Sequence, residues 1–284
     1  MTIPSHVVSI GRSAFGLCEN LSSLYIPSSV VSIGDKAFFN CSNLENLTFS
    51  PNVTSIGNYV FRGCEKLPSF VVPSSVTSIG DYAFYSCSSL VSLTIPASVT
   101  SIGDNAFDFC VSLENLTFLA NVTSFGSFVF RGCGKSSSFV IPSSVTSIGD
   151  YAFFASSFKS LTIPSSVTSI GDNAFSWCES LTSIYVNWDT PLNIDGDIFQ
   201  NVDMEKCTLY VPQGTQQAYS LANIWKNFEN IVEYDPTGIN KITTSTDAKE
   251  ISRYSLNGQR LSAPTKGLNI VKYSDGSVKK VAVQ

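Results

Sequence analysis

Apolar residues recur along most of this chain every 23 residues, a much longer period than that of a single strand or helix. Valine and phenylalanine each keep one position of this repeat. The two columns are Val7, Val30, Val53, Val76, Val99, Val122 and Val145, and Phe15, Phe38, Phe61, Phe84, Phe107, Phe130 and Phe153. A fixed period of this length predicts a solenoid, in which each repeat forms one coil.

One repeat unit, seen best from Leu90 to Cys110, contains the signals of a strand and two turns. Leu93–Ile95 alternates apolar and polar residues, which predicts a strand, and Pro96 ends it by removing a backbone donor. Gly103 marks a turn, and Asp104–Phe107 predicts one helical or 3₁₀ turn. Stacked units would place their strands about 4.8 Å apart. We therefore predict an α/β fold, a right-handed β/α solenoid of 23-residue coils with a parallel sheet.

A longer repeat is superimposed on the short one. Glu45–Phe49 recurs 69 residues later as Glu114–Phe118, and Phe61–Cys64 recurs as Phe130–Cys133. Three coils therefore were duplicated as one block, which is possible because each coil contacts only its neighbours.

The motif S-I-G-x-x-A-F-x-x-C, present at Ser78–Cys87 and Ser101–Cys110, carries a family resemblance. It resembles the BspA-type leucine-rich repeats found in surface proteins of anaerobic gut and oral bacteria. The likeness covers about residues 1–186. It implies a leucine-rich-repeat fold, a location on the cell surface or outside the cell, and adhesion to host matrix proteins or to other bacteria.

The repeat pattern divides the chain into three segments. Residues 1–186 form the regular solenoid, which opens inside a repeat at Thr2-Ile3-Pro4, so we expect a truncated N-terminus. Residues 187–233 hold a degenerate repeat and a closing helix and loop within 213–228, which we expect to cap the last coil. Residues 234–284 lose the repeat and form the third segment.

The third segment has the pattern of a small β domain. We expect strands at 251–256, 267–273 and 278–283, with hairpin turns at Asn257-Gly258 and Asp275-Gly276. The stretches 254–260 and 267–271 resemble the β domain that ends many exported proteins of the Bacteroidetes. That resemblance implies a role in sorting or surface attachment.

Charge and hydropathy exclude several classes of function. The net charge is −5, with the acidic excess in residues 1–233 and a scattered basic excess in the remainder. An acidic body lacks the basic footprint that nucleic acid binding needs, so we expect no nucleic acid partner. No apolar run reaches about 18 residues, so no membrane-spanning segment is expected. No signal peptide follows Met1 in this sequence.

Seven of the eight cysteines fall in one column of the repeat: Cys18, Cys41, Cys64, Cys87, Cys110, Cys133 and, after a one-residue deletion near Ser156, Cys178. The favoured interpretation is a ladder of reduced, buried thiols that behave as small hydrophobes. Disulfides between neighbouring coils are an alternative. A zinc site is not expected, because C-x-x-C pairs and nearby histidines are missing from the sequence.

An acidic column stands where each predicted helical turn begins. It comprises Asp35, Asp81, Asp104, Asp150 and Asp172, with Asn58 at the same place. We interpret these residues as N-caps of the turns. The alternative is a calcium ladder, which Arg12 and Ser127 would interrupt. We expect no metal and no other cofactor.

Catalytic residues are not expected either. His6 is the only histidine and lies in the first coil, so a Ser-His-Asp set is implausible. Glu45 and Glu114 lie three coils apart, too far for an acid/base pair. Nucleotide-binding glycine motifs are missing from the sequence. We therefore expect a protein that is not an enzyme.

The outward positions of the predicted strands are the candidate binding surface. They are Tyr25, Thr48, Val71, Thr94, Thr117, Val140, Thr162 and Tyr185. This face is hydroxylated and nearly uncharged, and such faces bind partners in many repeat proteins. The alternative is that these residues serve only β-propensity.

Few aromatic or basic residues are expected to bind a ligand outside this face. Trp177 is the exception and a possible aromatic contact, whereas Trp188 and Trp225 should close the core. Arg62 and Arg131 recur because their block was copied. We predict a non-enzymatic, surface or secreted protein that binds a protein partner. A carbohydrate-binding protein and a structural spacer are the alternatives, and the oligomeric state stays open.

Overall fold

A computed structural model describes residues 1–48, 52–119, 121–236, 250–255, 260–264, 266–273 and 278–283. The chain divides into two compact units. One comprises Met1–Val211 and Thr215–Val232, and the other Pro212–Gly214 and Glu233–Gln284. The described residues contain no helix that is long and apolar enough to span a bilayer.

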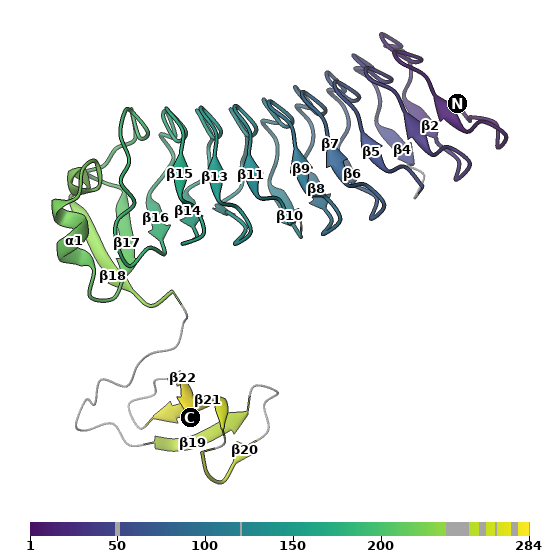
Figure 1. The fold of residues 1–284 in the computed structure, drawn as a ribbon. Helices are drawn as coiled ribbons and strands as arrows, with labels where there is room; N and C mark the ends of the chain where they lie inside the picture. The colour runs from purple at the N-terminus through teal and green to yellow at the C-terminus, as the bar shows by residue number, and fades with distance from the viewer. Residues whose placement is uncertain are drawn as a thin grey trace. The chain divides into compact units, whose positions relative to one another are not determined.

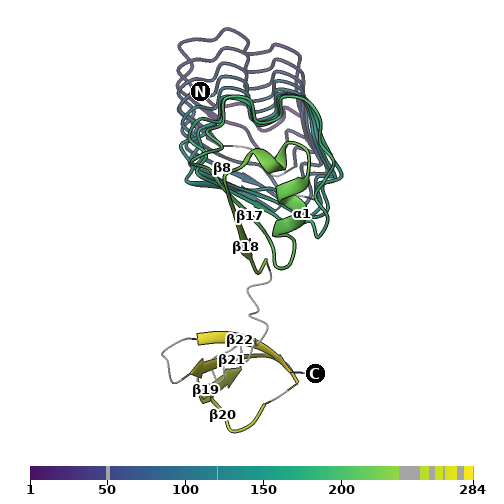
Figure 2. The same cartoon turned by 90° about the vertical axis from the view of Figure 1, so that its left-hand side faces the viewer.

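The first unit is a solenoid whose coils stack one behind another, as Figures 1 and 2 show from the side and from the end. Its first series of strands, which we call the strand face, is β2 (Ser23–Tyr25), β4 (Asn46–Thr48), β6 (Ser69–Val71), β8 (Ser92–Ile95), β10 (Asn115–Phe118), β12 (Ser138–Val140), β14 (Ser160–Ile163), β16 (Ser183–Val186), β17 (Thr208–Pro212) and β18 (Asn230–Tyr234). Neighbouring coils pair in parallel and in register, with Leu93 opposite Leu116. The predicted solenoid with a parallel sheet is confirmed.

A second series of two-residue strands follows the first around each coil. It comprises β1 (Ser9–Ile10), β3 (Ser32–Ile33), β5 (Ser55–Ile56), β7 (Ser78–Ile79), β9 (Ser101–Ile102), β11 (Ser124–Phe125), β13 (Ser147–Ile148) and β15 (Ser169–Ile170). The serine is outside and the apolar residue inside in most of these strands, as the period-2 pattern requires.

Among the described strands, the sheets are interrupted at two equivalent places. On the strand face β2 pairs with β4, β6–β8–β10 form a second group, and β12–β14–β16–β17–β18 form a third. The second series breaks at the same coils, between β3 and β5 and between β9 and β11. The two interruptions are 69 residues apart, so each copy of the duplicated block carries one.

The third side of each coil, which we call the turn face, runs from the Asp column to the Cys column. The predicted helical turn at Asp104–Phe107 is wrong, and the solenoid is almost without helix. Asn105 and Phe109 have positive φ of 57° and 59°, which breaks a helix twice in each coil. The N–H groups of Asn105, Phe107 and Phe109 instead donate to carbonyls of the next coil, at 2.9, 3.0 and 2.8 Å.

The core is filled by the predicted columns. Phe84 and Phe107 are fully buried, and their rings stack at 5.5 Å between neighbouring coils. The cysteines of the column are free thiols, buried except for Cys18. The thiol of Cys110 contacts the Phe84 carbonyl oxygen at 3.3 Å. Where the column holds Ser156, its hydroxyl donates to the Phe130 carbonyl at 2.7 Å.

The end of the solenoid is closed by the short helix α1 (Gln216–Leu221) and the 3₁₀ helix η1 (Trp225–Asn227). Trp188 and Trp225 are buried, as the sequence predicted. The Trp225 ring also meets the Phe199 ring edge-on, with centroids 5.7 Å apart, and its Nε1 donates to the Leu192 carbonyl. These contacts continue the core beyond the last regular coil.

The second unit contains an antiparallel sheet in the order β20–β19–β21–β22. Its strands are β19 (Glu250–Ser255), β20 (Arg260–Leu261), β21 (Gly267–Tyr273) and β22 (Val278–Val283). Three were expected from the sequence, and β20 was not. The expected turns at Asn257-Gly258 and Asp275-Gly276 lie outside the described residues.

Candidate functional site

The predicted strand-face residues do share one outward side of the solenoid. Val71, Val140 and Tyr25 are exposed by 69%, 62% and 49%. Thr48 and Thr117 are exposed too, whereas Thr94, Thr162 and Tyr185 are half-buried. Tyr185 lies flat against Tyr210 at 4.4 Å, so one face of its ring is covered. The outward side chains of this face offer mainly hydroxyl and methyl groups.

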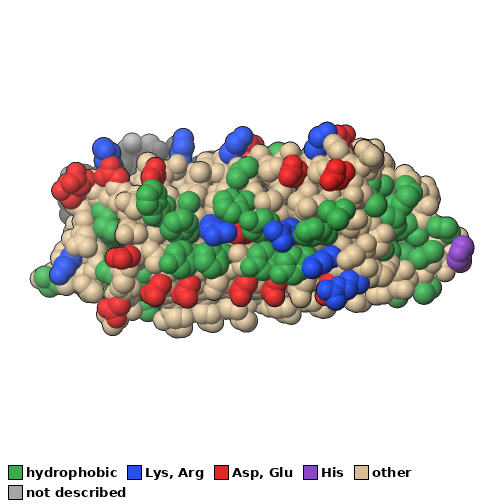
Figure 3. Space-filling view, turned by 90° about the horizontal axis from the view of Figure 1, so that it is seen from above, with side chains coloured by type: hydrophobic (Ala, Val, Ile, Leu, Met, Phe, Trp, Pro, Cys, Tyr) green, Lys and Arg blue, Asp and Glu red, His purple; other side chains and the backbone are tan. Residues whose placement is uncertain are grey.

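The turn face carries a denser set of contact-forming side chains, and the sequence interpretation missed it. Nine aromatic residues of the described coils lie there: Phe39, Tyr59, Tyr82, Tyr85, Phe109, Phe128, Tyr151, Phe154 and Trp177. Figure 3 shows this face, with hydrophobic rows along the solenoid, basic side chains between them and an acidic row beside them. Phe109 and Trp177 are exposed by 39% and 46%, and the other seven are half-buried. Among these nine residues, the sequence pointed only to Trp177.

Rings in one column of the turn face stack on each other. Tyr59 and Tyr82 are 4.9 Å apart and nearly parallel, and so are Phe128 and Tyr151. Trp177 leans on Phe154 at 6.4 Å. Each ring of the two stacked pairs therefore has one face covered by its neighbour.

Two arginines lie among these rings at equivalent places of the duplicated block. Arg62 lies 4.8 Å from the Tyr85 ring and 5.5 Å from the Phe39 ring. Arg131 lies 4.8 Å from both Phe109 and Phe128. A guanidinium over a ring face is attracted by the ring's quadrupole, so these cations are held in place.

Arg131 has an additional partner that Arg62 lacks. Its Nε and Nη2 donate to the two carboxylate oxygens of Asp108 at 2.9 and 2.6 Å. The Asp108 side chain is fully buried, and burial raises the pKa of its carboxyl, although the Arg131 bonds offset part of that effect. The equivalent position beside Arg62 holds Phe39 instead.

The acidic column runs along one edge of the turn face, but it does not cap helical turns. Asp81 Oδ1 accepts the backbone N–H of Asp104 in the next coil at 3.0 Å, and Asn58 accepts that of Asp81 at 2.8 Å. Each side chain therefore links two coils. The glycine before this column is required by close approach, since a Cβ on Gly57 would lie 2.6 Å from Asp35 Oδ1. The N-cap interpretation is therefore wrong, because these side chains accept N–H groups of the next coil and not of their own turn.

The other titratable groups of the solenoid do not converge. Within the described residues no cluster of three or more His, Cys, Asp or Glu is placed to hold a metal ion. Burial raises the pKa of Cys41 to about 11 and that of Cys178 to about 12, so these thiols stay protonated at neutral pH. The buried thiols therefore lack the depressed pKa of reactive cysteines.

Similarities to known proteins agree with this architecture. The family described as "BspA type Leucine rich repeat region" matches in six copies, over residues 1–114 and 100–225. A crystal structure of a leucine-rich repeat protein from Bacteroides ovatus is 30% identical, with a TM-score of 0.63, and the alignment covers 82% of this chain and 68% of that one.

Two further solved structures are less similar. A leucine-rich repeat protein of T. pallidum is 27% identical, with a TM-score of 0.49 over 64% of this chain and 77% of that one. A leucine-rich cell surface protein of Faecalibacterium prausnitzii is 22% identical, with a TM-score of 0.35 over 82% and 86%. A search of curated proteins gave no significant match.

Proposed function

The chain belongs to the BspA-type leucine-rich repeat family, and we propose that it is a non-enzymatic surface or secreted protein that binds a protein partner. The observation that carries the proposal is the turn face, with its nine aromatic residues and the two arginines among them. Tyr, Trp and Arg are the residues that most often dominate binding energy in protein interfaces. Here they form one continuous surface on a rigid scaffold.

Pre-organisation of this surface supports binding. The half-buried rings and the arginines already contact each other, as Arg62 contacts Tyr85, so little side-chain entropy is lost when a partner docks. The strand face lacks such anchors in its middle, where Thr94 and Thr117 stand. We therefore place the primary contact on the turn face and treat the predicted strand-face residues as a second surface.

A protein partner fits this geometry better than a glycan does. Sugar rings pack their C–H groups on open aromatic faces, whereas stacking in pairs covers one face of each of the rings of Tyr59, Tyr82, Phe128 and Tyr151. Adhesion to host matrix or bacterial surface proteins is the role that we propose, and the basic third segment, residues 234–284, would serve sorting or attachment.

The test is a binding screen of the full chain against immobilised matrix proteins, with a glycan array run in parallel. The turn-face variant carries Tyr59→Asn, Tyr82→Asn, Phe128→Asn and Tyr151→Asn. Asparagine already occupies this column at Asn105 and Asn173 with φ of 57° and 56°, so the fold should survive. The matched strand-face variant carries Val71→Thr and Val140→Thr, as at Thr94.

A protein partner that binds at least tenfold more weakly to the turn-face variant, and normally to the strand-face variant, supports the proposal. The reverse pattern would transfer the site to the strand face. Binding to glycans alone would refute the proposal in favour of carbohydrate capture. If the chain binds none of the matrix proteins and no glycan, a role as a structural spacer would be favoured instead.

A further inference from the structure

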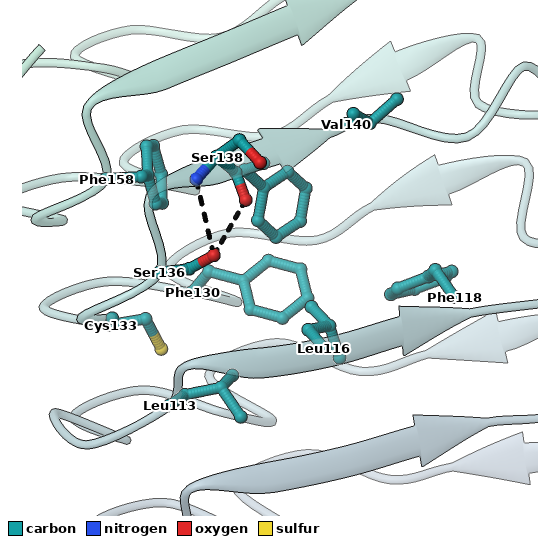
Figure 4. A pocket seen from close by; sticks show the side chains of 11 residues that line it. Leu113, Leu116, Phe118, Phe130, Cys133, Ser136, Ser138, Val140 and Phe158 are labelled. Atoms are coloured by element: carbon teal, nitrogen blue, oxygen red, sulfur yellow. Dashed lines mark hydrogen bonds between the residues drawn. The ribbon is translucent and has the colours of Figure 1, made fainter.

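An apolar pocket opens on the strand face where the sheet is interrupted between β10 and β12. Its lining includes the apolar residues Leu113, Leu116, Phe130, Phe139 and Phe158, and Figure 4 labels all of these but Phe139. Its volume is about 50 Å³, whereas one water needs about 10–15 Å³. The pocket therefore holds a few waters or one aliphatic side chain, and it is far smaller than a typical small-molecule site.

The pocket exists because one leucine of the repeat is missing. The column Leu44, Leu67, Leu90, Leu113 and Leu181 is buried in every case. At the corresponding position of the coil that begins with β12 stands Ser136. In the other copy of the duplicated block Leu67, only 1% exposed, fills the same place.

The strands beside the pocket have edges that the sheet does not use. Among the described strands, β10 pairs only with β8 on one side, and β12 pairs only with β14 on the other. Where pairing is intact, between β14 and β12, the Ser160 N–H donates to the Ser137 carbonyl of the preceding coil at 3.1 Å. The Ser138 N–H lies instead 3.4 Å from Ser136 Oγ, which donates to the Ser138 carbonyl at 2.8 Å. The Ser136 hydroxyl thus bonds to backbone groups of Ser138, and no neighbouring described strand pairs with β12 on this side.

The turn face keeps the two coils together at this boundary. Asn105, Phe107 and Phe109 donate across it, and so does Lys135 to the Leu113 carbonyl at 3.0 Å. The break in pairing therefore lies in the two series of strands and spares the turn face. The rim residues of the opening, Asn115, Thr117, Ser138 and Val140, are exposed and uncharged, so a charged side chain would find no ionic partner among them.

We propose that the opening between β10 and β12 is a docking site for an extended, uncharged peptide segment of a protein partner. The segment would pair its backbone with the strand edge and insert one leucine or isoleucine into the pocket, in the place that Leu67 occupies in the other copy. Extended peptides commonly bind sheet edges in this way, with pockets selecting alternate side chains. The site is separate from the turn face, so either proposal can fail alone.

The probe is a fluorescein-labelled, end-blocked hexapeptide with the sequence of residues 91–96, whose Leu93 lies inside the core in its own coil. Its counterpart has aspartate in place of that leucine. Fluorescence anisotropy with the full chain should show saturable binding of the first peptide and at least tenfold weaker binding of the second. Amide hydrogen exchange at Leu116 and Val140 should slow when the first peptide binds.

Two protein variants connect binding to the pocket. Ser136→Leu should fill the pocket with the chain's own side chain and abolish binding, while the control Thr94→Ser, on the intact sheet, should leave it unchanged. Leu67→Ser should open the equivalent pocket and raise the stoichiometry from one peptide to two. Far-UV circular dichroism checks the fold of each variant.

Equal binding of both peptides, binding that survives Ser136→Leu, or no binding at all would overturn the proposal. A chain that dimerises alone and dissociates on Ser136→Leu would also overturn it, since the occupant would then be a second copy.

Discussion

The buried carboxylate of Asp108 depends on Arg131, and removing the arginine should reveal how strongly. Arg131→Met keeps most of the apolar stem but leaves the fully buried carboxylate without its two donors. Breaking a buried ion pair costs about 3–5 kcal/mol. Because the Arg131 side chain is 28% exposed and water can enter, we expect about 3 kcal/mol at neutral pH.

The pH dependence has a definite sign. Burial already raises the pKa of Asp108 above its unfolded value, and loss of Arg131 raises it further. A carboxyl with a raised folded-state pKa stabilises the fold at low pH and loses that contribution as pH rises through the folded-state value. The penalty of Arg131→Met should therefore shrink as the solution is acidified from pH 7 toward the unfolded pKa.

The duplicated block supplies the control. Phe39 stands beside Arg62 where Asp108 stands beside Arg131, so Asp108→Phe should cost less than about 1 kcal/mol and should rescue most of the Arg131→Met loss. The assay is urea unfolding followed by far-UV circular dichroism at pH 7 and pH 4.5. A penalty below 1 kcal/mol at pH 7, or one that grows on acidification, would refute the reasoning.

Three further outcomes are expected. A thiol reagent should modify only Cys18 in the folded protein and all eight cysteines after unfolding, since the other seven are buried; rapid modification of a second thiol would contradict this. Asp81→Ala should cost about 1 kcal/mol in urea unfolding because the Asp104 N–H loses its acceptor, whereas Asp81→Asn should be neutral, as Asn58 shows; equal losses would indicate a role for the charge. Ser136→Leu should raise the unfolding free energy by about 1–2 kcal/mol by filling the pocket, and a loss would mean that Leu does not fit there.

The repeat columns could be predicted from the sequence because burial repeats with the coil. Phe107 and Cys110 each occupy the same environment as their copies one coil away, so the strict 23-residue period identifies them as core positions. The strand Ser92–Ile95 could be predicted for the same reason. The non-helical conformation of Asp104–Phe107 could not be predicted from the sequence, because bonds to the next coil hold the left-handed backbone of Asn105.

The turn face stayed hidden in the sequence because its aromatics are spread over three columns. Tyr82 follows the Asp column, Tyr85 follows the Phe column, and Phe109 precedes the Cys column. None of these columns is aromatic throughout, so each looks like a variable surface position. Only the contacts between the rings in space make them one surface: Tyr82 and Tyr85 are tilted with centroids 5.7 Å apart, and Phe109 meets Tyr85 edge-on at 5.8 Å.

The unequal bonding of the two sides gives the solenoid an anisotropic elasticity. Backbone bonds cross every coil boundary on the turn face, from the Ser13 donor to the Gln200 acceptor, while the strand face is interrupted at two places. Among the described strands no ladder joins β4 to β6 or β10 to β12, so a bending load that stretches the strand face is resisted at these places mainly by the turn-face bonds. Under such a load the solenoid would first open at the two sheet interruptions, before any coil unfolds.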